Sequence, residues 1–309
     1  MPIDWKSQLK DFVQHAKDRN PDASPFVDAN VSAVSQVVRG LGPDDRTPNA
    51  GAGARIVFNM ACKHVSEFCR ASKINEPRPY KNAYDLKRVE TGSRRARVDQ
   101  VIGEVTTLAC KDVLFGALET SGTGIRFYGD MSLVLKIPDE GRPDSWATVQ
   151  VLDRNSYDLE REPSRSKITE QCKDGSISYL GAAAGELSKW LGEWGASLEQ
   201  VVAIKVLLAL PNANRRWTTG QIAAQVLDDE DYVEVLYPRS FGHSDVHEVR
   251  VSAADAAAEA DIADREANGE APGLHELEWR QQRREAKRAL AELGVPLRVV
   301  TTAGRIKGS

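Results

Sequence analysis

Cysteine, aromatic residues and long apolar runs are all scarce in this chain of 309 residues. The few cysteines are too scattered for a disulfide framework; they are Cys62, Cys69, Cys110 and Cys172. The longest apolar stretch, residues 201–210, is interrupted by Lys205 and falls well short of the ~20 residues that cross a bilayer. Residues 1–10 lack the apolar core of a signal peptide. These absences predict a cytoplasmic protein with no membrane segment.

Catalytic and metal-binding motifs are missing as well. The chain has no Gly-x-Ser-x-Gly nucleophile turn, no Walker phosphate loop and no Gly-x-Gly-x-x-Gly fingerprint. Cys62, His64 and Cys69 have no second ligand pair at zinc-finger spacing, so we expect no metal there. Cys62 and Cys69 instead share one face of a predicted helix, where free cysteines act as small hydrophobes.

Hydrophobic periodicity divides the chain into a helical first part and a mixed second part. Apolar residues at helical spacing predict helices within residues 3–17, 27–41, 54–72 and 93–118. Beyond residue 120, strand-like patterns lie at about 125–135, 146–152, 232–237, 246–251 and 295–301. Helical patterns return between them, and residues 274–293 form a charged helix that ends at Gly294. This order predicts an α+β fold, with an N-terminal helical region followed by a mixed or antiparallel sheet.

The same pattern predicts three successive regions. Residues 1–118 form a helical accessory region, 119–252 an α+β core that carries the site, and 253–309 a charged C-terminal helix and tail. Inside the core we expect two strand pairs, the first of them antiparallel. The first joins 125–135 to 146–152, and the second joins 232–237 to 246–251.

The segment 122–136 is the first candidate site. Arg126, Tyr128 and Asp130 lie two residues apart, so in a strand they share one face. A guanidinium, a phenol and a carboxylate together suit a ligand that carries phosphate. Gly124 and Gly129 would let the backbone approach such a ligand closely. A buried strand with a structural Arg126–Asp130 ion pair explains the same residues almost as well.

Two further segments place polar residues beside predicted strands. Glu234 interrupts an apolar strand and either faces solvent or points with Tyr232 into a cleft. In a cleft, its carboxylate would act on a hydroxyl or on developing positive charge. Ser156 and Tyr157 lie in a stretch that either closes a polar turn or holds the edge of a ligand.

These segments together resemble a divergent ADP-ribosyltransferase-like domain, over about residues 120–252. Such domains place an Arg or His on an early strand, a Ser or Tyr on a later one and a Glu near the end. Arg126 comes first here and Glu234 last, with Ser156 or Tyr157 between them. The family's Ser-Thr-Ser is absent, and one acid instead of two stands in its Glu-x-Glu window.

The resemblance implies an enzyme that transfers ADP-ribose from NAD. In such an enzyme Arg126 grips the dinucleotide and Glu234 orients its ribose. Ser156 or Tyr157 then shapes the nicotinamide pocket. Tyr128, Asp130 and Tyr232 share predicted strand faces with Arg126 or Glu234, so we expect them to contact the same NAD.

A basic cluster between residues 78 and 97 supports an alternative function. The whole chain has a net charge of −4, so nucleic-acid binding would depend on a local patch of this kind. The cations expected to contact phosphates are Arg78, Lys81, Arg94, Arg95 and Arg97, with Lys87 and Arg88 between them. Tyr80 and Tyr84 would stack on bases. A solvated loop explains the cluster more simply, and a structural subunit that docks through its C-terminal helix is a third interpretation.

Overall fold

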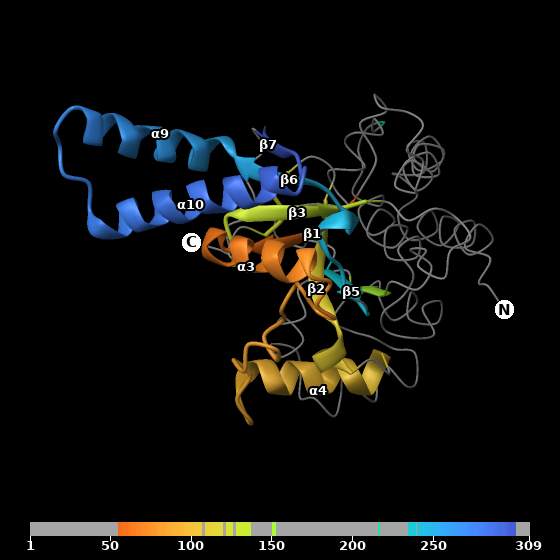
Figure 1. Ribbon diagram of the computed structural model, residues 1–309. Helices are drawn as coiled ribbons and strands as arrows, with labels where there is room; N and C mark the ends of the chain where they lie inside the picture. The colour runs from red at the N-terminus through yellow and green to blue at the C-terminus, as the bar shows by residue number, and fades with distance from the viewer. Residues whose placement is uncertain are drawn as a thin grey trace. The chain divides into compact units, whose positions relative to one another are not determined.

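The computed structural model of the chain describes residues 55–106, 109–119, 122–125, 128–136, 150–152, 216, 234–238 and 240–300 (Figure 1). Its helices and mixed sheet confirm the α+β class. None of the helices in these ranges is long and apolar enough to span a bilayer.

The chain forms two compact units, and each unit is assembled from separate stretches of sequence. The described residues of unit 1 are 83–106, 109–115, 150–152, 216 and 234–238. Those of unit 2 are 55–82, 116–119, 122–125, 128–136 and 240–300. The boundaries of these units do not coincide with the three successive regions that the sequence predicts.

Unit 2 is built on a sheet with the strand order β2-β1-β3-β6-β7. The strands are β1 (Arg55–Met60), β2 (Leu114–Glu119), β3 (Met131–Leu135), β6 (Val246–Ser252) and β7 (Leu297–Val300). β1 is antiparallel to β2 and to β3, and β3 is antiparallel to β6. β7 lies parallel to β6. The boundary between the units falls inside β2, whose residues 116–119 belong to unit 2.

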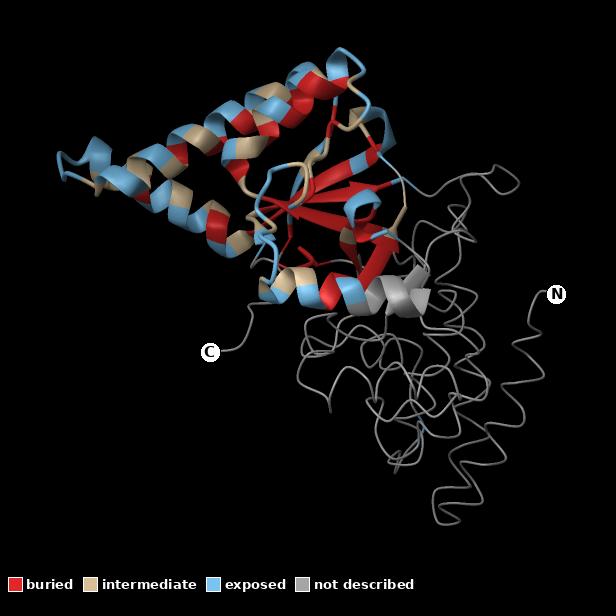
Figure 2. Ribbon diagram, turned by 90° about the horizontal axis from the view of Figure 1, so that it is seen from below, coloured by how far each residue is buried: buried red, intermediate tan, exposed pale blue. Residues whose placement is uncertain are grey.

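The two faces of this sheet differ in chemistry. One face is apolar and contributes Phe58 to a cluster of aromatic rings with Tyr80, Phe241 and Phe68. Phe68 lies on helix α3 (Cys62–Lys73), so the cluster joins the sheet to that helix. The opposite face places Asn59, Ser132 and Arg250 side by side across three strands. Nearly all described side chains of the central strands are buried (Figure 2).

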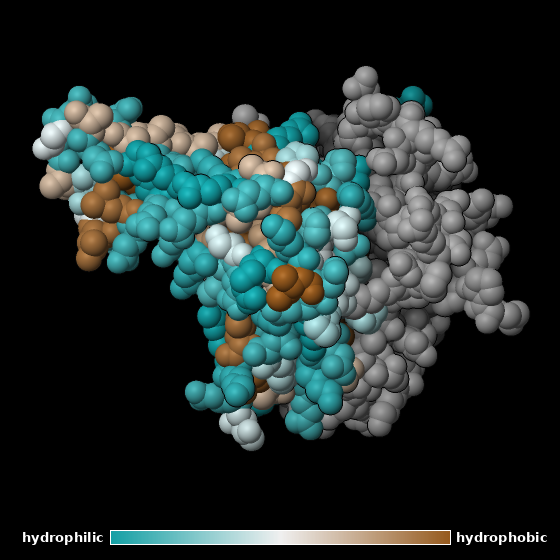
Figure 3. Space-filling model, viewed as in Figure 1, coloured by the Kyte–Doolittle hydropathy of each residue, from teal (hydrophilic) through white to brown (hydrophobic). Residues whose placement is uncertain are grey.

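The parallel connection from β6 to β7 consists of two helices, α9 (Ala253–Ala267) and α10 (Leu274–Glu292). Ser252 caps α9, because its Oγ accepts a hydrogen bond from the Asp255 N–H at 3.0 Å. The two helices form a hairpin that extends beyond the sheet, and α10 packs against α3 (Figure 1). The coloured part of the surface in Figure 3, which shows described residues, is mostly hydrophilic, with hydrophobic side chains in small separate patches.

Ion pairs join the two helices of the hairpin along its length. Toward the turn, Arg265 pairs with Glu276, and Arg280 pairs with Glu266. Toward the sheet, Glu259 pairs with both Arg283 and Lys287; the Nε–Oε2 and Nζ–Oε2 distances are 2.8 and 2.7 Å.

Unit 1 contains helix α4 (Arg94–Thr106), a short 3-10 helix at Cys110–Asp112 and the first residues of β2. It also contains the antiparallel pair β4 (Gln150–Leu152) and β5 (Glu234–Tyr237), in which Glu234 faces Leu152. Ser93 precedes α4, and its Oγ accepts a hydrogen bond from the Ala96 N–H at 3.2 Å.

Several predicted elements are confirmed, and others are wrong in type or pairing. The strand at 246–251 and the helix at 274–293 are present as β6 and α10. The helix predicted over 54–72 begins only at Cys62, because residues 55–60 form β1. The helix predicted over 93–118 ends at Thr106. Both predicted strand pairs are wrong, since β3 pairs with β1 and β6, whereas β4 pairs with β5.

Candidate functional site

The segment that carries the first candidate site is a loop fixed by one asparagine. Asn59 on β1 donates from Nδ2 to the carbonyls of Thr123 (2.8 Å) and Gly129 (3.1 Å) and to Ser132 Oγ (3.0 Å). Its Oδ1 accepts from the Ile125 N–H at 2.8 Å. β3 begins only at Met131 and the described residues 128–130 are not in a strand, so the alternation predicted for Tyr128 and Asp130 does not apply.

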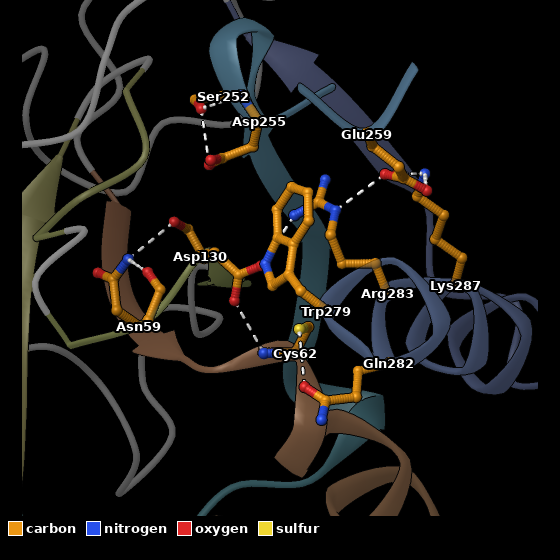
Figure 4. A network of polar contacts seen from close by, with 12 residues as sticks. Asn59, Cys62, Asp130, Ser252, Asp255, Glu259, Trp279, Gln282, Arg283 and Lys287 are labelled. Atoms are coloured by element: carbon orange, nitrogen blue, oxygen red, sulfur yellow. Dashed lines mark hydrogen bonds and ion pairs between the residues drawn. The ribbon is translucent and has the colours of Figure 1, made fainter. Parts of the chain in front are cut away.

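Asp130 ends this loop, and its carboxylate accepts hydrogen bonds from groups inside the fold. Oδ1 accepts a hydrogen bond from the Cys62 N–H at the start of α3, at 2.8 Å. Oδ2 accepts from Arg283 Nη1 at 2.9 Å and from Trp279 Nε1 at 3.1 Å (Figure 4). Three donors from two helices therefore hold Asp130. Its predicted role on a ligand-binding strand face with Arg126 and Tyr128 is not supported by these contacts.

Arg283 is the centre of this network. Its side chain is fully buried, contacts both Asp130 and Glu259, and lies over the Trp279 ring at 4.8 Å (Figure 4). Burial opposes the charge of the guanidinium, but the two carboxylates outweigh it and raise the pKa of Arg283. Arg283 is therefore an interior cation on the helix that the sequence predicts as charged.

The neighbouring thiol is not a nucleophile. Burial, with a smaller contribution from the charge of Asp130, raises the pKa of Cys62 to about 12. At neutral pH the side chain is therefore a protonated, unreactive thiol. Burial likewise raises the pKa of Cys69 to about 11, which agrees with the predicted role of both cysteines as small hydrophobes.

A second polar cluster lies within unit 1 and includes Glu234. The exposed fraction of Glu234 is 3%, so the interpretation in which this residue faces solvent is wrong. Nearby, Asp99 accepts a hydrogen bond from the Tyr84 hydroxyl at 2.5 Å and pairs with Arg95. Burial, followed by Asp99 and to a smaller extent Glu234, raises the pKa of Cys110 to about 12.

No known protein family, curated protein or solved structure matches this chain. Its function must therefore be argued from the chemistry of these residues. Among the described side chains, no three His, Cys, Asp or Glu groups come together as a metal-binding set.

Of the other residues assigned to an NAD site, most lie outside the described residues; they are Arg126, Ser156, Tyr157 and Tyr232. Tyr128 is described, and 43% of its surface is exposed on the loop that Asn59 fixes. Glu234 and Tyr128 thus remain the described candidates from that set.

The members of the basic cluster differ in exposure. Arg95 is bound, because it pairs with Asp99 and lies over the Phe115 ring at 4.0 Å. Lys81 pairs with Glu76 at 3.5 Å. Lys81 and the half-buried Arg78 belong to unit 2, whereas the rest of the cluster belongs to unit 1. The exposed members are Lys87, Arg88, Arg94 and Arg97.

Three residues that make the central contacts of these clusters are not among the sites predicted from the sequence. Asn59 stands within an apolar strand, where a lone polar residue is a signal that could have been noticed. Arg283 lies three residues before Ala286 and seven before Leu290, both buried, so helical spacing places it on the apolar stripe. Asp99 follows Arg95 by one helical turn, which is the spacing of an ion pair.

Proposed function

We propose that this chain binds nucleic acid through the exposed cations of residues 87–97. This basic surface consists of Lys87, Arg88, Arg94 and Arg97. The observation that carries the proposal is their common exposure on one short stretch of unit 1, where Glu90 is the exposed acid. Cations grouped in this way release counterions from a phosphate backbone when they bind it.

The local fold adds to the positive potential of the basic surface. α4 begins at Arg94, and its first turn contains no acidic residue. The N-terminus of a helix carries a partial positive charge and attracts phosphate. Arg97 Nη1 donates to the Gly92 carbonyl at 2.7 Å, which connects the helix to the preceding turn. The cations are therefore presented by an ordered segment.

The test is binding of a fluorescently labelled duplex, measured by anisotropy across a series of salt concentrations. Four phosphate contacts predict a slope of log K against log salt of about −3.6. Changing Lys87, Arg88, Arg94 and Arg97 to Gln should remove most of the affinity and most of the slope.

A matched control variant removes the same charge from exposed residues of unit 2. It changes Lys63, Lys73, Arg284 and Arg288 to Gln. Because both variants lose four positive charges, a general effect of net charge would weaken both equally. Equal weakening, or wild-type binding that does not respond to salt, would refute the proposal.

A second candidate function is ADP-ribosyl transfer from NAD, and the burial of Glu234 favours it. A carboxylate removed from water acts strongly on positive charge that develops on a ribose. In this proposal the bond between nicotinamide and ribose breaks, nicotinamide leaves, and a nucleophile of the target bonds to the ribose carbon. Glu234 stabilises the oxocarbenium-like state between these events.

This second proposal is tested by the release of free nicotinamide from NAD in the presence of cell extract. Glu234→Gln should lower the rate at least about 100-fold if the carboxylate acts on the reacting ribose. Asp255→Asn is the control, because Asp255 is a buried acid of unit 2 that hydrogen-bonds with Ser252. Equal rates for wild type and Glu234→Gln would remove Glu234 from the reaction.

A further inference from the structure

The two tyrosines close to the basic surface in sequence, Tyr80 and Tyr84, both make contacts inside the fold. The Tyr84 hydroxyl donates to Asp99, and burial raises the pKa of this phenol above its ordinary value. The Tyr80 ring stacks on Phe241 at 4.9 Å between centroids, and its hydroxyl donates to the Asn59 carbonyl at 3.0 Å. Within residues 83–106, Tyr84 is the one aromatic residue. The predicted stacking of both tyrosines on bases is therefore not supported.

The segment that carries the basic surface is also held by its own backbone. The Lys87 N–H donates to the Tyr84 carbonyl at 2.9 Å, and the Arg88 N–H donates to the Ala83 carbonyl at 2.8 Å. The Ser93 N–H donates to the Glu90 carbonyl at 3.0 Å. Moving Tyr84 out to stack on a base would break its hydrogen bond to Asp99 and disturb these turns.

Within described residues 83–106, which carry the basic surface, the one aromatic ring is held by contacts inside the fold, and this bears on which nucleic acid can bind. Proteins that prefer single strands combine cations with aromatic rings, and each stacked base contributes about 1–3 kcal/mol. Without that contribution, affinity depends on the density of phosphate charge. A duplex carries one negative charge per ~1.7 Å of its axis, and its salt slope per contact is about −0.9 compared with −0.7 for a single strand.

We infer that the ligand of the basic surface is a duplex, contacted through its phosphates and without readout of base sequence. This inference rests on the proposed nucleic-acid function and names its substrate class. For four contacts the two salt slopes differ by about 0.8. At about 50 mM salt, relative to 1 M, this difference corresponds to roughly tenfold tighter binding of the duplex.

The experiment compares single strands and duplexes of the same length and sequence, in separate DNA and RNA arms, with the full chain. We expect about tenfold preference for duplex at about 50 mM salt. We also expect affinities for A·T-rich and G·C-rich duplexes to agree within about twofold, because phosphate contacts carry no direct sequence information. Preference for duplex DNA over duplex RNA, or the reverse, identifies the natural source of the phosphates.

Two variants of Tyr84 make the test independent of charge. Tyr84→Leu removes the ring, and Tyr84→Phe keeps the ring but loses the hydrogen bond to Asp99. The inference predicts that Tyr84→Leu keeps the wild-type ratio of single-strand to duplex affinity, because the wild-type ring does not stack on bases; Tyr84→Phe shows what loss of the hydrogen bond alone does to this ratio. A selective loss of single-strand binding in Tyr84→Leu, or a wild-type preference for single strands, would overturn the inference. Absence of salt-dependent binding to every nucleic acid would instead refute the proposed function itself.

Discussion

The buried clusters of the two units contain the same groups, a carboxylate, an arginine and a thiol, but connect different parts of the chain. In unit 2, Asp130 is bound by groups 68, 149 and 153 residues away in sequence. In unit 1, the groups around Asp99 lie only 15, 4 and 11 residues away. The first cluster joins distant elements of the fold, and the second fixes one local segment.

Because of this difference, disrupting the two clusters should affect stability in different ways. Loss of the Asp130 network separates α3, α10 and the loop before β3, so it should destabilise unit 2 as a whole. Loss of the Asp99 network frees the segment that carries the basic surface, so its effect should be local. The comparison makes four predictions.

The largest effect is expected for Arg283→Met. The change leaves two half-buried carboxylates, Asp130 and Glu259, without the fully buried cation that they share, and should lower the free energy of unfolding by about 3–5 kcal/mol. Urea unfolding measures it. Arg284→Met, at the exposed neighbouring position, should change the same quantity by less than about 0.5 kcal/mol. Equal losses for the two variants would contradict the central position of Arg283.

A smaller loss of about 1–3 kcal/mol is expected for Arg95→Met. Asp99 keeps the Tyr84 hydroxyl as a donor, and 16% of the Arg95 side chain is exposed, so water can replace part of the lost contact. The same urea experiment measures the change. A loss as large as that of Arg283→Met would show that the two clusters are equivalent in stability.

The thiols of the two clusters predict a common loss of stability in alkali. The pKa of Cys62 and Cys110 rises from 9.0 to about 12 in the folded chain. Between these values the unfolded chain releases protons that the folded chain retains, so stability falls as pH rises. The loss begins near pH 9 and reaches up to about 1.4 kcal/mol per pH unit for each thiol.

Unfolding of wild type, Cys62→Ala and Cys110→Ala from pH 8 to about 10.5 measures these contributions. Each variant should flatten the pH dependence by one thiol's share. A variant whose curve stays parallel to the wild-type curve would show that its thiol ionises equally in both states.

The smallest effect is expected for Lys287→Met, at the edge of the unit 2 cluster. Lys287 pairs with Glu259, but 38% of its side chain is exposed and Glu259 retains Arg283. The loss should be about 0.2–1 kcal/mol and should shrink at high salt. Thermal unfolding at two salt concentrations measures it. A loss above about 2 kcal/mol would place Lys287 with Arg283 in importance.

The strand β6 and the helix α10 could be predicted from the sequence because their apolar residues recur with a clear period, and the fold class follows from such elements. Residues 55–60 have none, since Ile56, Val57 and Phe58 form a continuous apolar run. Such a run fits a buried strand and a buried helix equally well. The choice between strand and helix then depends on the flanking residues. Because the residues after Ala61 have a helical pattern, the predicted helix wrongly includes residues 55–60.

The candidate sites were harder to predict than the fold, for a different reason. Local spacing shows that Arg95 can reach Asp99 and that Arg283 lies on a buried stripe. It cannot show that Asp130 is the partner of Arg283, because 153 residues separate them. The polar residues just before Asp130 in the sequence are Arg126 and Tyr128, and these favour a ligand-binding role.

The distance in sequence between Asp130 and Arg283 also has a consequence during synthesis. At about 5–20 residues per second, a ribosome needs roughly 8–30 s to reach Arg283 after adding Asp130. Through that interval the Asp130 carboxylate has no contact with Arg283. We therefore expect unit 2 to complete its packing only after α10 has been synthesised.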